Sequence, residues 1–151
     1  MSLIHCVDNT VFDLPMEEGV DPAAGAQFAV ALPLNCRTQI MSVSFHWVSA
    51  AAAANRYIRV QAESGGVALW YSNYIPAVII NEVLDFSFVA GGPPSPLIAP
   101  AGTFIQVGFG QGLINDAQQV VRINVTNINA GDQISDVWIQ YRRWPRPVYT
   151  Y

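Results

Sequence analysis

The sequence contains no lysine and few charges of either sign: charged residues make up 12% of the chain, and the formal net charge is −4. Globular domains usually carry about 25% charged residues. Binding to nucleic acid in general requires a basic surface, so this composition argues against that class of function. A weakly charged monomer is poorly soluble, which favours a subunit that covers its surface against other chains.

All the basic side chains are arginines. The planar guanidinium group forms bidentate, partly buried contacts more readily than a lysine ammonium does, which suits a protein interface. The base composition of a GC-rich genome would give the same bias, so both explanations stay open.

Cysteine is scarce as well, since the chain has only Cys6 and Cys36. Two cysteines do not make a disulfide framework, and we expect each to be a small, partly buried thiol. The first ten residues, MSLIHCVDNT, lack the basic segment of a secretory signal, and no apolar run is long enough to cross a membrane. These features predict an intracellular origin with reduced thiols.

Metal ligands are few and poorly spaced. His5, Cys6 and Asp8 share one short segment, but a closed zinc site needs four ligands, usually as two spaced pairs, and the second pair is missing. Oxygen ligands suited to calcium occur in loops without the spacing of a calcium-binding loop: Asn115, Asp116, Asp132 and Asp136. The sequence therefore predicts no metal site.

Catalytic motifs are also missing. The chain has no nucleophile elbow, phosphate-binding loop or dinucleotide fingerprint. His46 is expected on the polar face of a strand, without a chemical partner. Glu82 and Asp85 point to opposite faces of a strand, which argues against the carboxylate pair of a glycosidase. We expect no catalytic residue and no cofactor, and hence a protein that is not an enzyme.

What the sequence does have is strand periodicity, most clearly over residues 39–63. Apolar and polar residues alternate there with a period of two, which puts one set of side chains on each face of a strand. The first run places Met41, Val43, Phe45 and Trp47 on one face, and the second places Arg56, Ile58, Val60 and Ala62 on one face. Five alanines, residues 50–54, join the two runs, and they are too few for a stable helix. We interpret this stretch as scaffold, with Arg56 and Arg59 as bracing or interface charges.

Similar runs continue along the chain and are separated by Gly, Pro and Asn turns. They total about eight strands with no amphipathic helix, a pattern typical of a sandwich or barrel. The fold class predicted is all-β: a single jelly-roll β-sandwich of about eight antiparallel strands. We assign 1–25 to an N-terminal arm, 26–144 to the sandwich, and 145–151 to an extended, proline-rich C-terminal tail.

Aromatic residues and arginine, which are enriched in interface hot spots, crowd the C-terminus. The segment 91–102 is a proline-rich loop and a second candidate for contact with a partner. The predicted interface residues are Trp144, Arg146, Tyr149, Tyr151, Pro93, Pro94 and Pro96. For Trp138 and Tyr141, a place in the core of the last strand is the alternative explanation.

Several segments occur in an order that suggests a family. FHWVS is followed by a small-residue link and NRYIRVQ; later come a proline-rich loop, Pro100-Ala-Gly before TFIQVGF, a loop with Asp116, and GDQISDVWIQYRRW. This order resembles small single-jelly-roll structural proteins of tailed bacteriophages, including capsid decoration or cement proteins. The resemblance covers residues 26–144 and leaves the arm and tail unexplained. It implies an oligomeric virion protein without catalytic activity.

The leading hypothesis is therefore a non-enzymatic structural virion protein of the capsid decoration type. It would dock on a capsid or neighbouring virion protein as a dimer or trimer, in particles assembled in the host cytoplasm, with no nucleic-acid or membrane partner. The alternative is a carbohydrate-binding or receptor-binding jelly-roll module, in which Trp70, Tyr71 and Tyr74 would stack on sugar rings. A jelly-roll enzyme such as a cupin is disfavoured because two distant histidines do not make its metal site.

Overall fold

A computed structural model describes residues 16–34, 36–50, 55–72, 75–78, 82–92, 97–98, 104–109 and 118–145. Within these ranges the chain forms eleven strands and no helix, so no helix there is long and apolar enough to cross a membrane. The strands are β1 (Met16–Glu18), β2 (Phe28–Ala31), β3 (Cys36–Val48), β4 (Arg56–Ser64), β5 (Val67–Tyr71), β6 (Ile75–Val78), β7 (Val83–Ala90), β8 (Leu97–Ile98), β9 (Phe104–Phe109), β10 (Val120–Thr126) and β11 (Gln133–Pro145).

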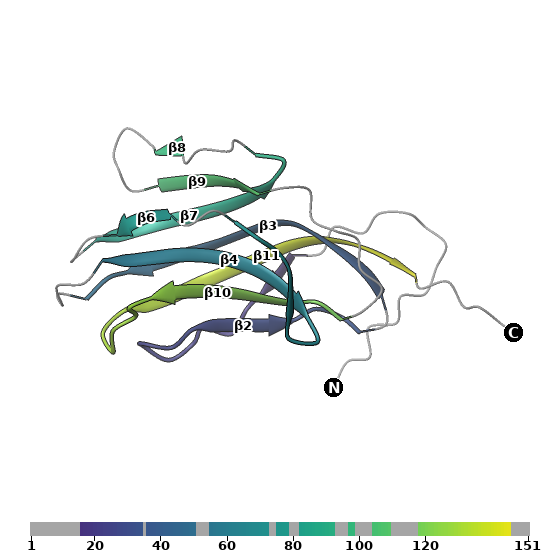
Figure 1. Cartoon of the computed structure of the whole chain (residues 1–151), viewed down its shortest axis with the longest axis horizontal. Coiled ribbons are helices and arrows are strands. Elements are labelled where there is room, and N and C mark those ends of the chain that lie inside the picture. Colours follow the sequence, from purple (N-terminus) through teal and green to yellow (C-terminus); the bar gives the residue numbers. More distant parts are fainter. Residues whose placement is uncertain are drawn as a thin grey trace, which may run out of the picture.

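The strands build two sheets that pack face to face as a β-sandwich (Figure 1). One sheet has six strands in the order β1-β11-β3-β7-β9-β8. The other has the order β2-β10-β4-β5, and β6 also pairs with β4. The prediction of an all-β sandwich is thus confirmed.

One pairing contradicts the prediction that all strands are antiparallel. β9 lies parallel to β7, with Phe86 opposite Ile105 and Phe88 opposite Val107. A parallel neighbour cannot follow through a tight hairpin, so the chain must cross back between the two strands. The 14 positions that separate Ala90 from Phe104 include the proline-rich loop and β8. The additional strands β8 and β9 extend the six-stranded sheet beyond β7.

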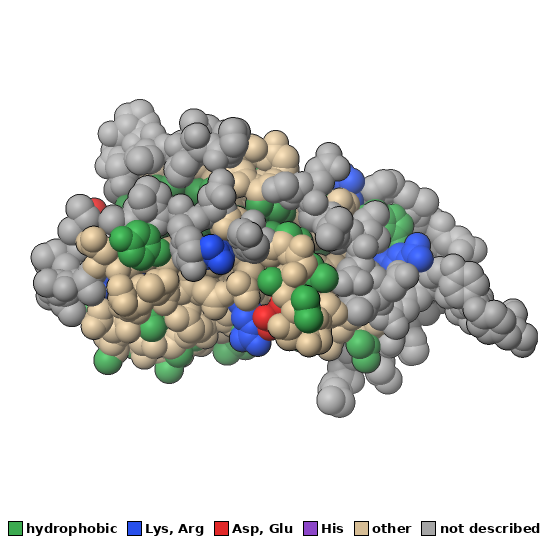
Figure 2. Space-filling view, viewed as in Figure 1, with side chains coloured by type: hydrophobic (Ala, Val, Ile, Leu, Met, Phe, Trp, Pro, Cys, Tyr) green, Lys and Arg blue, Asp and Glu red, His purple; other side chains and the backbone are tan. Residues whose placement is uncertain are grey.

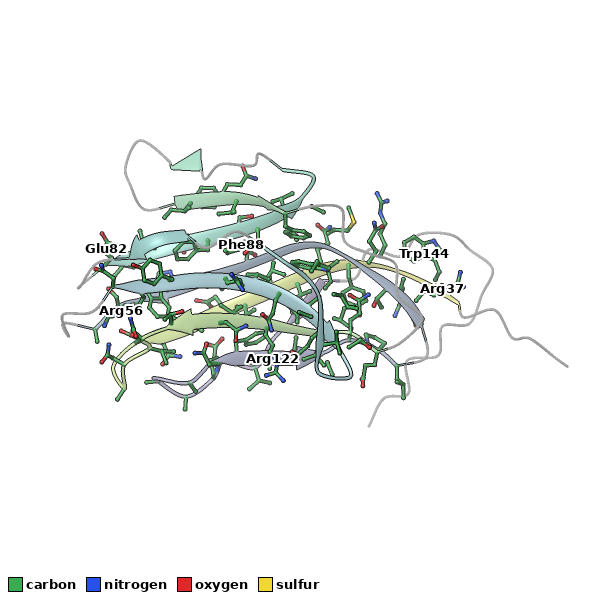
Figure 3. All side chains as sticks on the ribbon, viewed as in Figure 1. Arg37, Arg56, Glu82, Phe88, Arg122 and Trp144 are labelled. Atoms are coloured by element: carbon green, nitrogen blue, oxygen red, sulfur yellow. The ribbon has the colours of Figure 1, made fainter. Side chains whose placement is uncertain are left out.

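The core lies between the sheets and is made by the alternating apolar residues that the periodicity predicted. Val43, Phe45 and Trp47 of β3 are buried, and so are their partners on β7, two phenylalanines and a leucine. Phe45 stacks on Phe86 with ring centroids 5.2 Å apart. Phe88 of β7, labelled in Figure 3, is completely buried. Burial of such side chains stabilises the fold by about 1.5–3 kcal/mol each.

Two β-bulges in the ladder between β3 and β11 shift the alternation by one residue. Met41 has no partner in β11, because Ser42 pairs with Gln140 while Ile40 pairs with Tyr141. Ile40 and Val43 can therefore both face the core, and Met41, expected on the core face, is only half-buried. This placement corrects the prediction for Met41.

The second bulge lies in β11, between Ser135 and Trp138. Asp136 has a φ of 50° there, a left-handed conformation that Asp tolerates better than most residues. The extra residue lets Ile134 and Val137 both face the core and turns Trp138 to the outer face, where it is exposed. Tyr141 is completely buried, so the core explanation holds for Tyr141 but not for Trp138.

The prediction of reduced thiols is wrong for Cys36. This residue opens β3, is completely buried, and is disulfide-bonded. The sequence has one other cysteine, Cys6, which lies outside the described residues. Two cysteines are too few to reveal a disulfide by their number and spacing, so the sequence favoured reduced thiols.

Candidate functional site

The residues predicted to form an interface are mostly outside the part of the chain that the structure describes. This applies to Pro93, Pro94, Pro96, Arg146, Tyr149 and Tyr151. Trp144 lies near the end of β11, half-buried and directly opposite Arg37 of β3 (Figure 3). Part of the predicted N-terminal arm pairs within the chain, because residues 16–18 form β1 beside β11.

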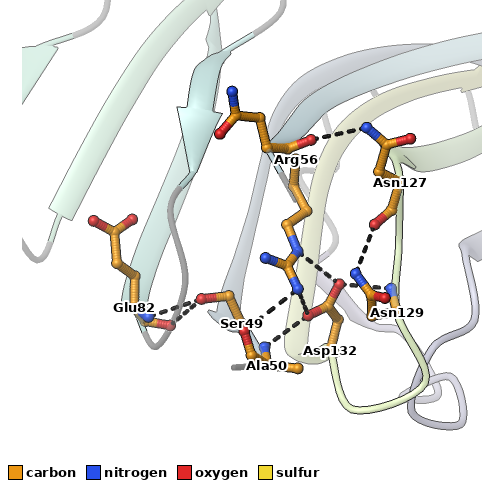
Figure 4. Close-up of polar contacts among 8 residues, drawn as sticks. Ser49, Ala50, Arg56, Glu82, Asn127, Asn129 and Asp132 are labelled. Carbon is orange, nitrogen blue, oxygen red and sulfur yellow. Dashed lines mark hydrogen bonds and ion pairs between the residues drawn. The ribbon is translucent and has the colours of Figure 1, made fainter. Parts of the chain in front are cut away.

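The most highly connected polar cluster joins the two sheets at one end of the sandwich (Figure 4). Arg56 opens β4 of the five-stranded sheet, and Asp132 precedes β11 of the six-stranded sheet. The Nε atom of Arg56 donates to Oδ2 of Asp132 at 3.0 Å, and Nη2 donates to Oδ1 at 2.9 Å. Both side chains are completely buried. The pair is therefore a bidentate, desolvated salt bridge between the sheets.

Backbone groups use the remaining acceptor positions of Asp132. The N–H of Ala50 donates to Oδ1 at 2.7 Å, and the N–H of Asn129 donates to Oδ2 at 2.8 Å. Nη2 of Arg56 also lies 3.4 Å from the carbonyl oxygen of Ala50. The carboxylate thus joins the segment after β3, the turn before β11 and the start of β4. We call Arg56, Asp132, Ala50 and Asn129 the inter-sheet latch.

Neighbouring hydrogen bonds extend this end of the sandwich to β7 and β10. The N–H of Ser49 donates to the carbonyl oxygen of Glu82 at 2.9 Å, and the N–H of Glu82 donates to Oγ of Ser49 at 2.7 Å (Figure 4). Asn127, which has a φ of 58°, donates from Nδ2 to the carbonyl oxygen of Asn55. Polar contacts therefore fasten three connections of the fold here: β3 to β4, β6 to β7, and β10 to β11.

The opposite end of the sandwich has a smaller buried polar tie. Gln119, just before β10, donates from Nε2 to the carbonyl oxygen of Thr38 at 2.6 Å and to its Oγ1 at 3.1 Å. Thr38 belongs to β3 of the other sheet, and both side chains are buried. Polar contacts therefore hold the sheets in register at both ends of an apolar core.

The latch changes the acidity of Asp132. Burial by itself raises the pKa of this carboxyl group, but the hydrogen bonds from Arg56, Ala50 and Asn129, together with the positive charge of Arg56, outweigh it and lower the pKa below its ordinary value. The carboxylate is therefore ionised in the folded protein at neutral pH, as the bidentate contact requires.

We predict that the latch makes the protein sensitive to acid. Because the folded-state pKa is lower than the unfolded value of about 3.9, the stability it contributes is present above that pH and is lost as pH falls through the folded-state pKa. Urea unfolding between pH 2 and 6 should show a free energy that declines towards acid. The decline should be less steep for Asp132→Asn; equal slopes in the two proteins would contradict the prediction.

The carboxylates that suggested calcium do not meet at one site. Both oxygens of Asp132 are occupied by the latch, and Asp136 lies in the bulge of β11. Asn115 and Asp116 lie outside the described residues. Among the residues that the structure describes, no three His, Cys, Asp or Glu side chains gather as metal ligands would.

His46 was expected to have no chemical partner, and this was wrong. Its Nδ1 lies 2.8 Å from Oδ1 of Asp85 on the neighbouring strand β7. The two residues are direct cross-strand partners on the outer face of the six-stranded sheet. Because 39 positions separate the two residues, no local motif reveals their pairing. We interpret the contact as a surface cross-strand pair, because no second acid, base or nucleophile accompanies it in the described structure.

Among the described residues, the outer face of the five-stranded sheet carries few charges. Arg122 of β10 and Glu63 of β4 form an ion pair there. On the side of the molecule shown in Figure 2, charged side chains are few and lie among apolar and uncharged polar ones. Trp70, proposed as a sugar-stacking residue, instead stacks on Phe109 with ring centroids 4.2 Å apart and is only partly exposed. Tyr74 and the side chain of Tyr71 lie outside the described residues.

No protein-family model matches this chain, and no curated protein is significantly similar to it in sequence.

Proposed function

We propose that the chain is a non-enzymatic structural protein of a virion, of the capsid decoration type, that docks on a capsid or neighbouring virion protein as an oligomer. Three features of the molecule support this function: the strand order, the buried polar clusters between the sheets, and a described surface that carries few charges and leaves a strand edge open among the described residues.

The strand order carries most weight. When the short strands β6 and β8 and the parallel strand β9 are set aside, eight strands remain in chain order: β1, β2, β3, β4, β5, β7, β10 and β11. They pair as β1-β11-β3-β7 and as β2-β10-β4-β5. If these eight strands are numbered 1 to 8 in chain order, the two sheets have the orders 1-8-3-6 and 2-7-4-5. Two four-stranded sheets that share the chain in this way are expected of a jelly roll built from two Greek keys. We therefore assign the sandwich to the jelly-roll class, with β6, β8 and β9 as additions.

The polar clusters support a structural role. The buried latch has saturated acceptors, so its carboxylate has no free position for a substrate or metal ion. It holds together connecting segments that belong to the two sheets. The resulting rigidity suits a protein that serves as a building block. Repetition of weak docking contacts on a symmetric particle would then supply strong overall binding.

The C-terminal tail supplies the test of docking. We expect deletion of residues 145–151 to weaken co-sedimentation with capsid particles about tenfold or more, because Trp, Tyr and Arg side chains dominate interface energies. The β-sheet circular dichroism should stay unchanged. Thr150→Ala is the matched control, since it alters the same tail without removing an aromatic or arginine side chain. Equal binding by the deleted and full-length chains would rule out docking through the tail.

A further inference from the structure

The strand β2 forms an open edge of the five-stranded sheet. It pairs with β10 on one side and is the last strand in the sheet order, so its second side has no neighbouring strand among the described residues (Figure 1). An open edge presents unpaired N–H and C=O groups that can pair with another strand. The hydrogen-bond pattern shows which residues present them.

Two contacts between β2 and β10 and their flanking residues show which backbone groups of β10 point towards β2. The N–H of Leu32 donates to the carbonyl oxygen of Gln119 at 2.8 Å. Beyond the other end of β2, the side-chain amide of Gln27 donates to the carbonyl oxygen of Val125 at 2.8 Å and accepts from its N–H at 2.7 Å. Gln119 and Val125 therefore direct backbone groups towards β2, and so do the odd-numbered residues between them, because antiparallel ladders alternate.

Their partners in β2 follow from the register. Val121 lies opposite Val30, and Ile123 lies opposite Phe28. Phe28 and Val30 thus bond to β10, which leaves the backbone groups of Ala29 and Ala31 pointing towards the open edge. Both alanines are exposed.

The other edge strands carry features that discourage pairing, and β2 does not. The described edge β1 is three residues long and includes Glu17 and Glu18, and β8 has only two residues. The edge strand β5 pairs with β4 through a ladder that a register shift interrupts. Natural sheets protect their edges by short strands, charges and bulges of this kind. The sequence of β2, Phe-Ala-Val-Ala, has no charge and regular pairing.

We propose that β2 pairs antiparallel with β2 of a second copy, so that the two five-stranded sheets join across a two-fold axis. The axis would lie at Val30. Ala29 of each copy would then face Ala31 of the other and exchange both backbone hydrogen bonds with it. This pairing rests on the proposed function, because it would provide the oligomer which that function includes. It uses a different surface from the C-terminal tail.

Side chains and charges permit this pairing. The outer-face side chains at the junction are methyl groups, and on the inner face the partly buried Val30, which packs on the core, would meet its own copy. The charged residue of the neighbouring strand β10 is Arg122, opposite Ala29. The two copies of Arg122 would be separated by three strand spacings of about 4.8 Å, beyond the screening length of about 8 Å in physiological salt. No like charges therefore face each other across the junction.

The test measures the mass of the full-length chain by light scattering over a range of concentrations. The wild-type chain should reach twice its subunit mass of 16.5 kDa. Ala31→Pro should stay monomeric at those concentrations, because it removes an edge-facing N–H and keeps the ladder with β10. Ala31→Lys should also be monomeric, since it places a charge on the edge, and it replaces the proline variant if that variant does not fold. Ala68→Lys is the matched control: it puts the same charge on an exposed alanine of β5 and should leave the dimer intact.

Three outcomes would overturn the proposal. The first is a wild-type chain that stays monomeric at every concentration, and the second is folded Ala31 variants that remain dimeric. The third is dissociation by Ala68→Lys alone, or a mass that grows without limit, because either would mean that another edge makes the contact. Capsid co-sedimentation of the Ala31 variants separates the two proposals: monomeric variants that still bind particles would leave the docking function in place.

Discussion

Replacing Arg56 with methionine should destabilise the protein by about 3–5 kcal/mol, because it leaves the buried carboxylate of Asp132 without its counter-charge. Methionine preserves much of the apolar length of the side chain, so it leaves little empty space. The loss of stability therefore measures mainly the missing charge and not a cavity. The free energy of unfolding in urea measures it. At 0% exposure the site has no access to water that would screen the remaining charge.

A double variant provides the control. Arg56→Met combined with Asp132→Asn should be more stable than Arg56→Met alone, since the amide carries no charge and still accepts a hydrogen bond from the N–H of Ala50 or Asn129. A swap at a half-buried position of the same strand, Arg59→Met, should cost less than Arg56→Met. Strictly additive effects at Arg56 and Asp132 would show that the two residues do not act together.

Removal of the disulfide should have the second largest effect on stability. We expect Cys36→Ser to lower the free energy of unfolding by about 2–4 kcal/mol, the usual contribution of a native disulfide that constrains the unfolded chain. For a domain of this size, this loss corresponds to a melting temperature lower by roughly 5–15 °C. Differential scanning calorimetry under non-reducing conditions measures the change.

The free-thiol content is the matching control. The unreduced, denatured wild-type chain should show no reactive thiol, and addition of a reductant should lower its melting temperature to near that of Cys36→Ser. A protein with free thiols and the same stability in the presence and absence of reductant would contradict this account of Cys36.

The long strands could be predicted from the sequence because their side chains alternate over many residues. Residues 56–62 and the segment around Phe45 have their predicted faces, since a period of two specifies which side chains enter the core. The bulges at Met41 and Asp136 could not be predicted, because one inserted residue changes the phase without a signal in composition. The shortest strands, such as β8, contain too few residues to show a period.

The latch could be predicted only in part. Arg56 falls on the core-facing side of its strand, and a buried charge requires a partner, so the need for a counter-charge was visible in the sequence. Its partner Asp132 lies 76 positions away, and only the fold brings the two together. The same limit applies to His46 and Asp85, which only the pairing of β3 with β7 brings together. These side-chain contacts thus depend on the pairing and packing of distant strands, which spacing along the chain does not reveal.

Mass spectrometry of purified virus particles from cells that express this chain tests the central claim most directly. If the chain is a structural virion protein, it should remain with the particles through density-gradient purification, in a copy number proportional to that of the protein on which it docks. Its absence from purified particles, with the folded chain present in the remaining lysate, would contradict the proposed function.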